Sequence, residues 1–325
     1  MPTISVIIPT YNRSEQLREA VNGILKQTFT DFEVLVIDDG STDDTPEVIK
    51  QISDNRIKYF YKVNGGASSA RNLGLTKAQG QYIALLDDDD LWPENYLAAM
   101  IDKMEENKDY GLAYALFKII VPDGSLKAGF KPERYFSGWL TQNFFGTSPC
   151  INPSATIFRQ STRNGMFFDE FLKSGDDYDF FLRLSAKTKF LCVPDIFVTR
   201  RIRTDGLSKK AGREFSPNLC LILERFYFYM EGGGKISRFK AMYKIGSRYR
   251  RLARSYFEEG YRIAAIKLLK KAIGYYPYEP QYYKELLKAL LLSEKNDKMP
   301  NWQMPKPLPT YITITQSIRD STQCR

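Results

Sequence analysis

Four consecutive aspartates end an apolar run of the sequence, in the stretch ALLDDDDLWP at residues 84–93. Neighbouring carboxylates repel one another, so an ordered turn that holds Asp87, Asp88, Asp89 and Asp90 costs free energy unless a cation or backbone N–H groups compensate. Alternate acids such as Asp87 and Asp89 can hold a hard divalent cation, which typically also binds substrate phosphates. In the simpler interpretation, Asp90 caps the following helix and its neighbours are solvated.

A second acidic cluster, in the stretch SGDDYDFFLRLS, offers candidates for acid–base chemistry. The sequence contains no His, which excludes an imidazole base, a His-activated nucleophile and a His metal ligand. Proton transfer therefore falls mainly to carboxylates such as Asp176 and Asp177. Both residues also suit the N-terminal cap of the helix that follows them.

These acids need a scaffold, and the first 120 residues alternate strand-like apolar runs with helical periods. The strand-like runs are ISVIIPT, FEVLVIDD, IKYFY and QYIALL. Such alternation predicts an α/β fold class with a mainly parallel, doubly wound sheet and helices on both faces. Ligands of such sheets bind beyond the carboxyl ends of the strands, so we expect PTYNR, DDGSTDD, KVNGGASSARN and DDDDLWP to converge on one cleft.

Two common classes of nucleotide enzyme are poorly supported by these loops. No GxGxxG follows the first strand, and no GxxxxGK[ST] is present. This argues against a dehydrogenase and against a P-loop enzyme.

The chain is expected to divide into three parts. We predict a main domain over residues 1–231, a helical extension over residues 235–296 after a Gly232–Gly234 linker, and a flexible tail over residues 297–325. The spacing of small and aromatic residues between 252 and 277 matches one tetratricopeptide repeat. One match is short of a solenoid, so a helical hairpin packed on the main domain is expected.

The net charge of +9 is concentrated late in the chain, where residues 200–299 hold 23 Lys and Arg against 10 Asp and Glu. This basic region suits anionic lipid, nucleic acid or an anionic substrate, or is a solvated helical surface. No nucleic-acid motif accompanies it. Because no run approaches the roughly 20 apolar residues of a membrane span and the N-terminus lacks the features of a secretion signal, we expect a cytoplasmic chain.

Five stretches, in order and at these spacings, resemble family 2 glycosyltransferases of the GT-A fold: SVIIPTYNR, FEVLVIDDGSTDDT, NGGASSARNLGL, YIALLDDDDLW and SGDDYDFFLRL. The resemblance covers about residues 3–210. It implies an inverting, metal-dependent hexosyltransferase that moves a sugar from a nucleotide-diphosphate donor, expected to be a UDP-sugar. The acceptor would be a hydroxyl of a glycan or lipid-linked acceptor in cell-surface polysaccharide or glycan synthesis.

The resemblance also implies roles in donor binding. Pro9, Thr10 and Tyr11 would line the base pocket. Asp39 would accept a hydrogen bond from a base N–H, which implies uracil, although DDGSTDD also suits a simple capped turn. Arg71 would reach the diphosphate, although it also suits a helix surface.

The acid run matches the metal-binding DxD motif of the family, with Mn or Mg as the expected cofactor. Asp87 and Asp89 match the two acids of this motif, and Asp89 would be the direct metal ligand. Asp90 would support the metal site. Asp88 is grouped with the donor-binding residues and is the acid of the four expected to be dispensable.

The base and one further donor contact follow from the same resemblance. Asp177 is the implied base, and Asp176 stands where the family has Glu. Arg203 stands where many relatives carry a histidine near the metal, and it can contact a diphosphate but cannot ligate a metal. Four aromatic residues could stack on sugar rings, although core positions are commoner for such residues: Trp92, Trp139, Phe144 and Phe145.

Two alternative functions remain open. A nucleotidyltransferase would need a basic, glycine-rich phosphate signature near the first strand, which ISVIIPTYNR lacks. A non-catalytic nucleotide-sugar or glycan-binding module would bind the donor without turnover. For a lipid-linked acceptor, we expect peripheral contact between the basic C-terminal helices and an anionic membrane at its inner face, and no nucleic-acid partner.

Overall fold

The computed structural model describes residues 1–121, 125–129, 135–146, 151–172, 174–201 and 212–291. The chain forms two compact units, one from residues 1–144 and 148–206 and the other from residues 145–147 and 207–325. The predicted tail over residues 297–325 lies outside the described residues.

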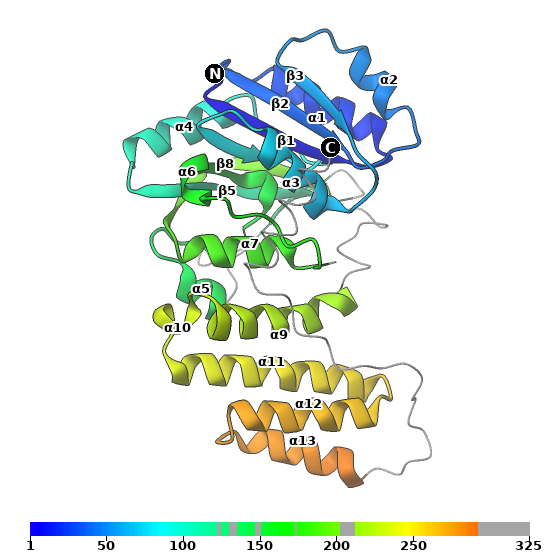
Figure 1. Ribbon diagram of the computed structural model, residues 1–325, viewed down its shortest axis with the longest axis vertical. Helices are drawn as coiled ribbons and strands as arrows, with labels where there is room; N and C mark the ends of the chain where they lie inside the picture. Colours follow the sequence, from blue (N-terminus) through cyan, green and yellow to red (C-terminus); the bar gives the residue numbers. More distant parts are fainter. Residues whose placement is uncertain (122–124, 130–134, 147–150, 173, 202–211, 292–325) are drawn as a thin grey trace. The chain divides into compact units, whose positions relative to one another are not determined.

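The first unit is built on one sheet (Figure 1). Its strands are β1 (Ile4–Thr10), β2 (Phe32–Asp38), β3 (Ile57–Tyr61), β4 (Tyr82–Leu85), β5 (Tyr110–Ile120), β6 (Leu126–Ala128), β7 (Thr156–Arg159) and β8 (Lys189–Arg201). Their order is β3-β2-β1-β4-β7-β5-β6, and β8 also pairs with β5.

The sheet is mixed, which corrects the predicted mainly parallel, doubly wound sheet. As predicted, β1 is parallel to β2 and β4, and β2 is parallel to β3. However, β7 lies antiparallel between β4 and β5, and β6 is antiparallel to β5, while β8 is parallel to β5. The segment TIFR of β7 has two apolar residues, Ile157 and Phe158, which favour burial but carry no signal for strand direction.

Helices cover both faces of the sheet. The helices that lie between the strands in the sequence are α1 (Ser14–Leu25), α2 (Thr45–Lys50), α3 (Ala67–Lys77), α4 (Tyr96–Glu106), α5 (Thr141–Gly146), α6 (Gln160–Arg163) and α7 (Asp176–Ser185). Ile4, Val6 and Ile8 of β1 share one apolar core with α1 and α4. Ile7 points to the opposite face, where α3 lies so close that a Cβ added at Gly74 would fall 2.4 Å from the Ile7 side chain. Cover on both faces holds the end of β1 in place.

The second unit is helical in its described part. Its helices are α9 (Gly212–Tyr229), α10 (Gly232–Lys235), α11 (Arg238–Glu258), α12 (Arg262–Tyr275) and α13 (Pro280–Leu291). Helices α11, α12 and α13 pack in succession (Figure 1). Helices therefore occupy the predicted extension, whose tetratricopeptide character stays a prediction.

The boundary between the units differs from the predicted one. It lies between residues 206 and 207 rather than at the Gly232–Gly234 linker, because α9 packs on α11 and contributes fully buried side chains such as Ile222 and Leu223 to the second unit. The glycines themselves begin the short helix α10. No helix in the described part of the chain combines the length and the apolar character needed to cross a bilayer.

Candidate active site

The acid run begins at the carboxyl end of β4, beside the end of β1. The N–H of Leu86 donates to the carbonyl of Ile7 at 3.0 Å, so the parallel pairing of β1 and β4 continues up to the first aspartate. The N–H of Asp87 donates to Oγ of Ser154, in the 3-10 turn η2 (Pro153–Ala155), at 3.0 Å. The sheet and this turn together fix where the acid run starts.

Asp88 joins the acid run to the end of β1. Thr10 Oγ1 donates to Asp88 Oδ2 at 2.8 Å, and Arg13 Nη1 donates to Asp88 Oδ1 at 2.7 Å. Asp88 is only 3% exposed, and burial raises the pKa of its carboxyl to about 6 against the opposing effect of Arg13. Asp88 thus ties the acid run to Thr10 and Arg13, and its expected dispensability stays a prediction.

The protein neutralises the other three acids only in part. Arg71 pairs with Asp87 at 2.7 Å, and Arg13 reaches Asp89 at 3.3 Å. Burial, followed by the charge of Asp87, raises the pKa values of Asp89 and Asp90. Within the described residues, Oδ1 of Asp90 is buried without a hydrogen-bond partner. The acid run therefore carries a surplus of negative charge.

This donor set fits a hard divalent cation. The side chains of Asp87 and Asp89 are 31% and 20% exposed, so their oxygens remain accessible, and carboxylates are ligands that Mg²⁺ and Mn²⁺ accept. The described part of the chain gathers no group of three or more potential metal ligands. An ion held here would complete its coordination with substrate or water oxygens, as Mg²⁺ commonly does.

Arg71 links the two acidic clusters of the sequence. Its Nη2 donates to Asp87 Oδ1 at 2.7 Å, and its Nη1 donates to Asp176 Oδ2 at 3.2 Å. Its guanidinium lies 5.4 Å from the ring centroid of Phe168. Burial alone would lower the pKa of Arg71, but the charges of Asp87 and Asp176 outweigh it and raise that pKa. Arg71, which is expected to contact the diphosphate, thus also joins the two acidic clusters.

Asp176 and Asp177 lie in the first turn of α7. Gly175 precedes them with φ 79°, a left-handed conformation that glycine adopts without strain. Ser68 Oγ donates to Asp176 Oδ2 at 2.8 Å. Burial, followed by the charge of Asp176, raises the pKa of Asp177. A carboxyl group with a raised pKa is a stronger proton acceptor once ionised, so Asp177 suits a general base.

Asp39 follows β2, and the chain itself occupies both of its carboxylate oxygens. The N–H groups of Gly65 and Gly66 donate to Oδ1 and Oδ2 at 2.9 and 2.7 Å, and Lys62 Nζ donates to Oδ1 at 2.6 Å. Asp39 therefore holds the loop that leads into α3. A nucleotide base would have to share these oxygens.

Asp39→Ala is expected to lower the free energy of unfolding by about 2–4 kcal/mol without any nucleotide present. The substitution leaves the N–H groups of Gly65 and Gly66 and the ammonium of Lys62 without their acceptor. Urea unfolding of both proteins measures the difference. Asp102→Ala, at an exposed position of α4, is the matched control and should change stability by less than about 0.5 kcal/mol. If Asp39→Ala were as stable as the wild type but failed to bind nucleotide, Asp39 would have a base-binding role and no structural one.

The remaining predicted donor residues lie near the end of β1 or outside the described residues. Pro9 is buried, and Thr10 is committed to Asp88. Tyr11 follows the strand with its side chain exposed. Arg203 lies outside the described residues.

Three of the four aromatic candidates are core residues. Trp92 is buried, stacks on Tyr96 and donates Nε1–H to the carbonyl of Ser154. Phe144 and Phe145 are also buried. Trp139 differs from them because it is 53% exposed, and its stacking on a sugar stays a prediction.

Three site residues were missed by the sequence analysis. Arg13 pairs with Asp88, Ser68 donates to Asp176, and Lys62 pairs with Asp39. All three belong to, or border, polar segments that follow strands. The position of Arg13 in such a segment could therefore have identified it as a site residue. Its pairing with Asp88 could not have been predicted from the sequence.

The sequence is similar to those of several known proteins. A family model described as Glycosyl transferase family 2 matches residues 5–165. An uncharacterized glycosyltransferase of Methanocaldococcus jannaschii is 32% identical over 207 residues, which cover 62% of this chain and 71% of that protein. A GalNAc(5)-diNAcBac-PP-undecaprenol beta-1,3-glucosyltransferase of Campylobacter jejuni is 29% identical over 269 residues, covering 79% of this chain and 85% of that protein.

Other relatives are much longer than the matched region. An uncharacterized glycosyltransferase of Rickettsia bellii is 34% identical over 224 residues, which cover 67% of this chain but 31% of that protein. The chain thus spans about a third of the length of such relatives.

Solved structures support the fold. S. aureus TarS 1-349 in complex with UDP aligns with a TM-score of 0.61 at 19% identity, covering 100% of this chain and 92% of that one. The mannosyltransferase PcManGT from Pyrobaculum calidifontis, in complex with GDP-Man and Mn2+, aligns with a TM-score of 0.55 at 17% identity and covers 89% of this chain and 84% of that one.

Proposed function

The chain belongs to glycosyl transferase family 2, and we propose that it transfers a sugar from a UDP-sugar to a hydroxyl group with inversion at the anomeric carbon. The proposed acceptor is a glycan or a lipid-linked glycan of cell-surface polysaccharide or glycan synthesis. The name of the Campylobacter jejuni relative, which specifies an undecaprenol-linked acceptor, supports the lipid-linked class.

The observation that carries this proposal is the junction at Arg71. Its guanidinium binds Asp87 of the acid run and Asp176 of the α7 terminus, at 2.7 and 3.2 Å. The acids suited to a metal and the helix end that carries the candidate base therefore share one site. A transferase uses both clusters, whereas a binding module has no need of the base.

In the proposed reaction, Asp177 accepts the proton of the acceptor hydroxyl while that oxygen attacks the anomeric carbon. The bond between this carbon and the phosphate oxygen of the donor breaks, and UDP leaves with the bonding electrons. Attack opposite the leaving phosphate inverts the configuration. Asp176, fixed by Ser68 and Arg71, holds its negative charge beside Asp177 and helps to keep the pKa of the base raised.

Asp87 and Asp89 are the proposed ligands of a divalent cation, Mn or Mg, with Asp90 behind them. When bound, that ion supplies positive charge to the diphosphate leaving group. The raised pKa values of Asp89 and Asp90 and the unpartnered oxygen of Asp90 support this assignment, as does the Mn2+ in the PcManGT complex.

The donor site is proposed to lie along the ends of β1 and β2. Pro9, Thr10 and Tyr11 would flank the base, Asp39 would contribute an oxygen shared with the Gly65–Gly66 loop, and Arg71 would approach the diphosphate. The basic second unit is proposed to meet an anionic membrane, where a lipid-linked acceptor resides.

Calorimetric titration of UDP and GDP, each with and without Mn²⁺, tests the proposed function. UDP is expected to bind only with the ion and at least about tenfold more tightly than GDP. Asp89→Asn should weaken UDP binding by at least about tenfold, because it removes one charge from the ion site. Asp102→Asn, which removes a charge from the exposed face of α4, should bind like the wild type.

Two results would contradict the proposal. If neither nucleotide binds under any condition, the acid run is a capped acidic turn on an inherited fold. If UDP binds but no UDP-sugar is turned over by the wild type, the chain is the non-catalytic module.

A further inference from the structure

Helix α13 has apolar side chains on two faces. Tyr282 and Ala289 are buried against the rest of the second unit. Four large apolar side chains lie exposed on the outward face: Tyr283, Leu287, Leu290 and Leu291. The three leucines follow Tyr283 by four, seven and eight residues, so all four share one side of the helix. These four are called the outer stripe. A surface helix ordinarily has a single apolar stripe, which faces the core, so the outer stripe marks a contact surface.

Lys284 and Lys288 flank the outer stripe, one helical turn apart. Neither lysine has an ion-pair partner in the described part of the chain, and Nζ of Lys288 lies 5.6 Å from the ring centroid of Phe257. Glu285, the one acid of α13, is already paired with Arg250 at 2.8 Å. The flank of the outer stripe therefore carries uncompensated positive charge.

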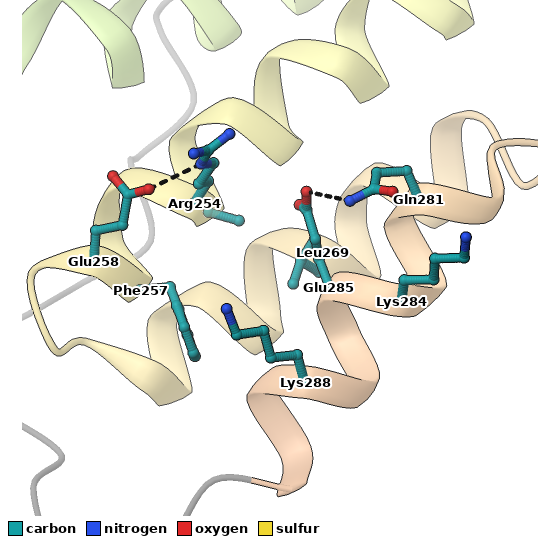
Figure 2. A pocket seen from close by; sticks show the side chains of 9 residues that line it. Arg254, Phe257, Glu258, Leu269, Gln281, Lys284, Glu285 and Lys288 are labelled. Carbon is teal, nitrogen blue, oxygen red and sulfur yellow. Dashed lines mark hydrogen bonds and ion pairs between the residues drawn. The ribbon is translucent and has the colours of Figure 1, made fainter.

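The same two lysines line a groove of about 570 Å³ among α11, α12 and α13 (Figure 2). On the far wall, Arg254 pairs with Glu258 at 2.8 Å, so this acid is neutralised within the groove. The apolar part of the lining consists of Ala253, Phe257 and Leu269. An anionic group that enters the groove meets uncommitted ammonium groups and no uncommitted carboxylate among its lining residues.

The charge pattern selects among possible occupants. A second copy of α13, paired antiparallel about a two-fold axis, would set one lysine flank against the other, and like charges repel. Residues 292–325 contain five Lys and Arg against three Asp and Glu, so they offer no surplus of acids. Leucines and a tyrosine flanked by lysines are instead typical of helices that lie in the interface of an anionic membrane.

We propose that α13 docks on an anionic bilayer, with the outer stripe toward the acyl chains and lipid phosphates at Lys284 and Lys288 along the groove. This names the membrane-contact element of the enzyme and rests on the proposed function, in which a lipid-linked acceptor lies at that surface. Lysine–phosphate attraction supplies selectivity for anionic lipid, and the outer stripe supplies the apolar contact.

Co-sedimentation with vesicles tests this docking in the full-length chain. The probes are phosphatidylcholine vesicles and vesicles in which roughly a third of the lipid is phosphatidylglycerol. The wild type is expected to bind the anionic vesicles, and added salt should weaken that binding. Lys284→Gln with Lys288→Gln should lower the partition constant about 30-fold, from about 1 kcal/mol per lysine. Leu287→Ser with Leu290→Ser should lower it at least about tenfold.

Lys267→Gln with Lys270→Gln is the matched control, because it removes the same charge from exposed positions of the neighbouring α12. This control should lose less than about threefold if α13 is the docking element. An equal loss in both lysine variants would overturn the assignment to α13, as would equal wild-type binding to neutral and anionic vesicles. Release of the protein from anionic vesicles by millimolar phosphate, at constant ionic strength, would make the groove a free-anion site and overturn bilayer docking. Circular dichroism melting confirms that each variant is folded.

The release of UDP from a water-soluble UDP-sugar, without vesicles, separates this inference from the proposed function. The α13 variants should release UDP at the wild-type rate. Normal UDP release by a wild type that ignores anionic vesicles would overturn the docking alone. Docking on anionic vesicles by a wild type that releases no UDP would overturn the transferase alone.

Discussion

Asp177→Asn is expected to lower kcat by about 10³-fold, within the range for removal of a general base, while UDP affinity stays within about threefold of the wild type. The amide keeps the shape of the side chain but cannot accept a proton from the acceptor. UDP release measures turnover, with water or a sugar as the acceptor, and calorimetry measures UDP affinity. The separation of the two quantities identifies a group that acts on the acceptor rather than on the nucleotide.

The pH dependence of turnover also tests the role of Asp177, because the direction of the change can be predicted. Burial and the charge of Asp176 raise the pKa of Asp177, and only the ionised carboxylate accepts a proton. The kcat/KM of the wild type should therefore rise with pH, with its inflection above the ordinary aspartate value of about 3.9. Asp102→Asn is the control and should keep both kcat and the profile. Unchanged turnover in Asp177→Asn would show that another group is the base.

Arg71→Gln is expected to lower the free energy of unfolding by about 3–5 kcal/mol, the usual cost of removing one partner from a buried ion pair. The substitution leaves the carboxylates of Asp87 and Asp176 without the guanidinium that joins them. Urea unfolding at neutral pH measures the loss. Adding Asp176→Asn removes one of the two unpaired carboxylate charges. The double variant should therefore regain about 0.5–3 kcal/mol of the lost free energy of unfolding.

Arg18→Gln is the control for this series. Arg18 is on α1 and pairs with Glu15 at 3.5 Å across an exposed surface, so its loss should change stability by less than about 1 kcal/mol. If Arg71→Gln were as stable as this control but failed to bind UDP, Arg71 would serve as a phosphate ligand alone. The junction of the two acidic clusters would then lack a structural role.

The convergence of the acid run with the end of β1 could be predicted because it depends on a general property of parallel sheets. Continuous apolar runs such as ISVIIPT mark strands buried on both faces, and the carboxyl ends of parallel strands share one edge. Thr10 and Asp88, far apart in the sequence, are accordingly in contact. The hydrogen bond between them could not be predicted, since it depends on side-chain positions set by packing.

Other contacts of the site could not be predicted from the spacing of residues in the sequence. Arg71 contacts Asp87 and Asp176 only once the fold brings α3, α7 and the segment after β4 together. Nothing in the local sequence of α3 specifies these partners. The same holds for Asp39, whose partners at Gly65 and Gly66 come from a loop that enters after the next strand. The direction of β7 could not be predicted either, because the two apolar residues of this four-residue strand, Ile157 and Phe158, fit a parallel or an antiparallel neighbour equally well.

The insertion of β7 between β4 and β5 also constrains the order of folding during synthesis. The strands β3, β2, β1 and β4 can pair as soon as β4 is made, but β4 then remains an open edge until Thr156–Arg159 is available. Those residues follow about seventy positions later, a delay on the order of ten seconds at typical translation rates. During that interval the nascent chain exposes the unpaired backbone of β4, an edge at which another chain can add a strand.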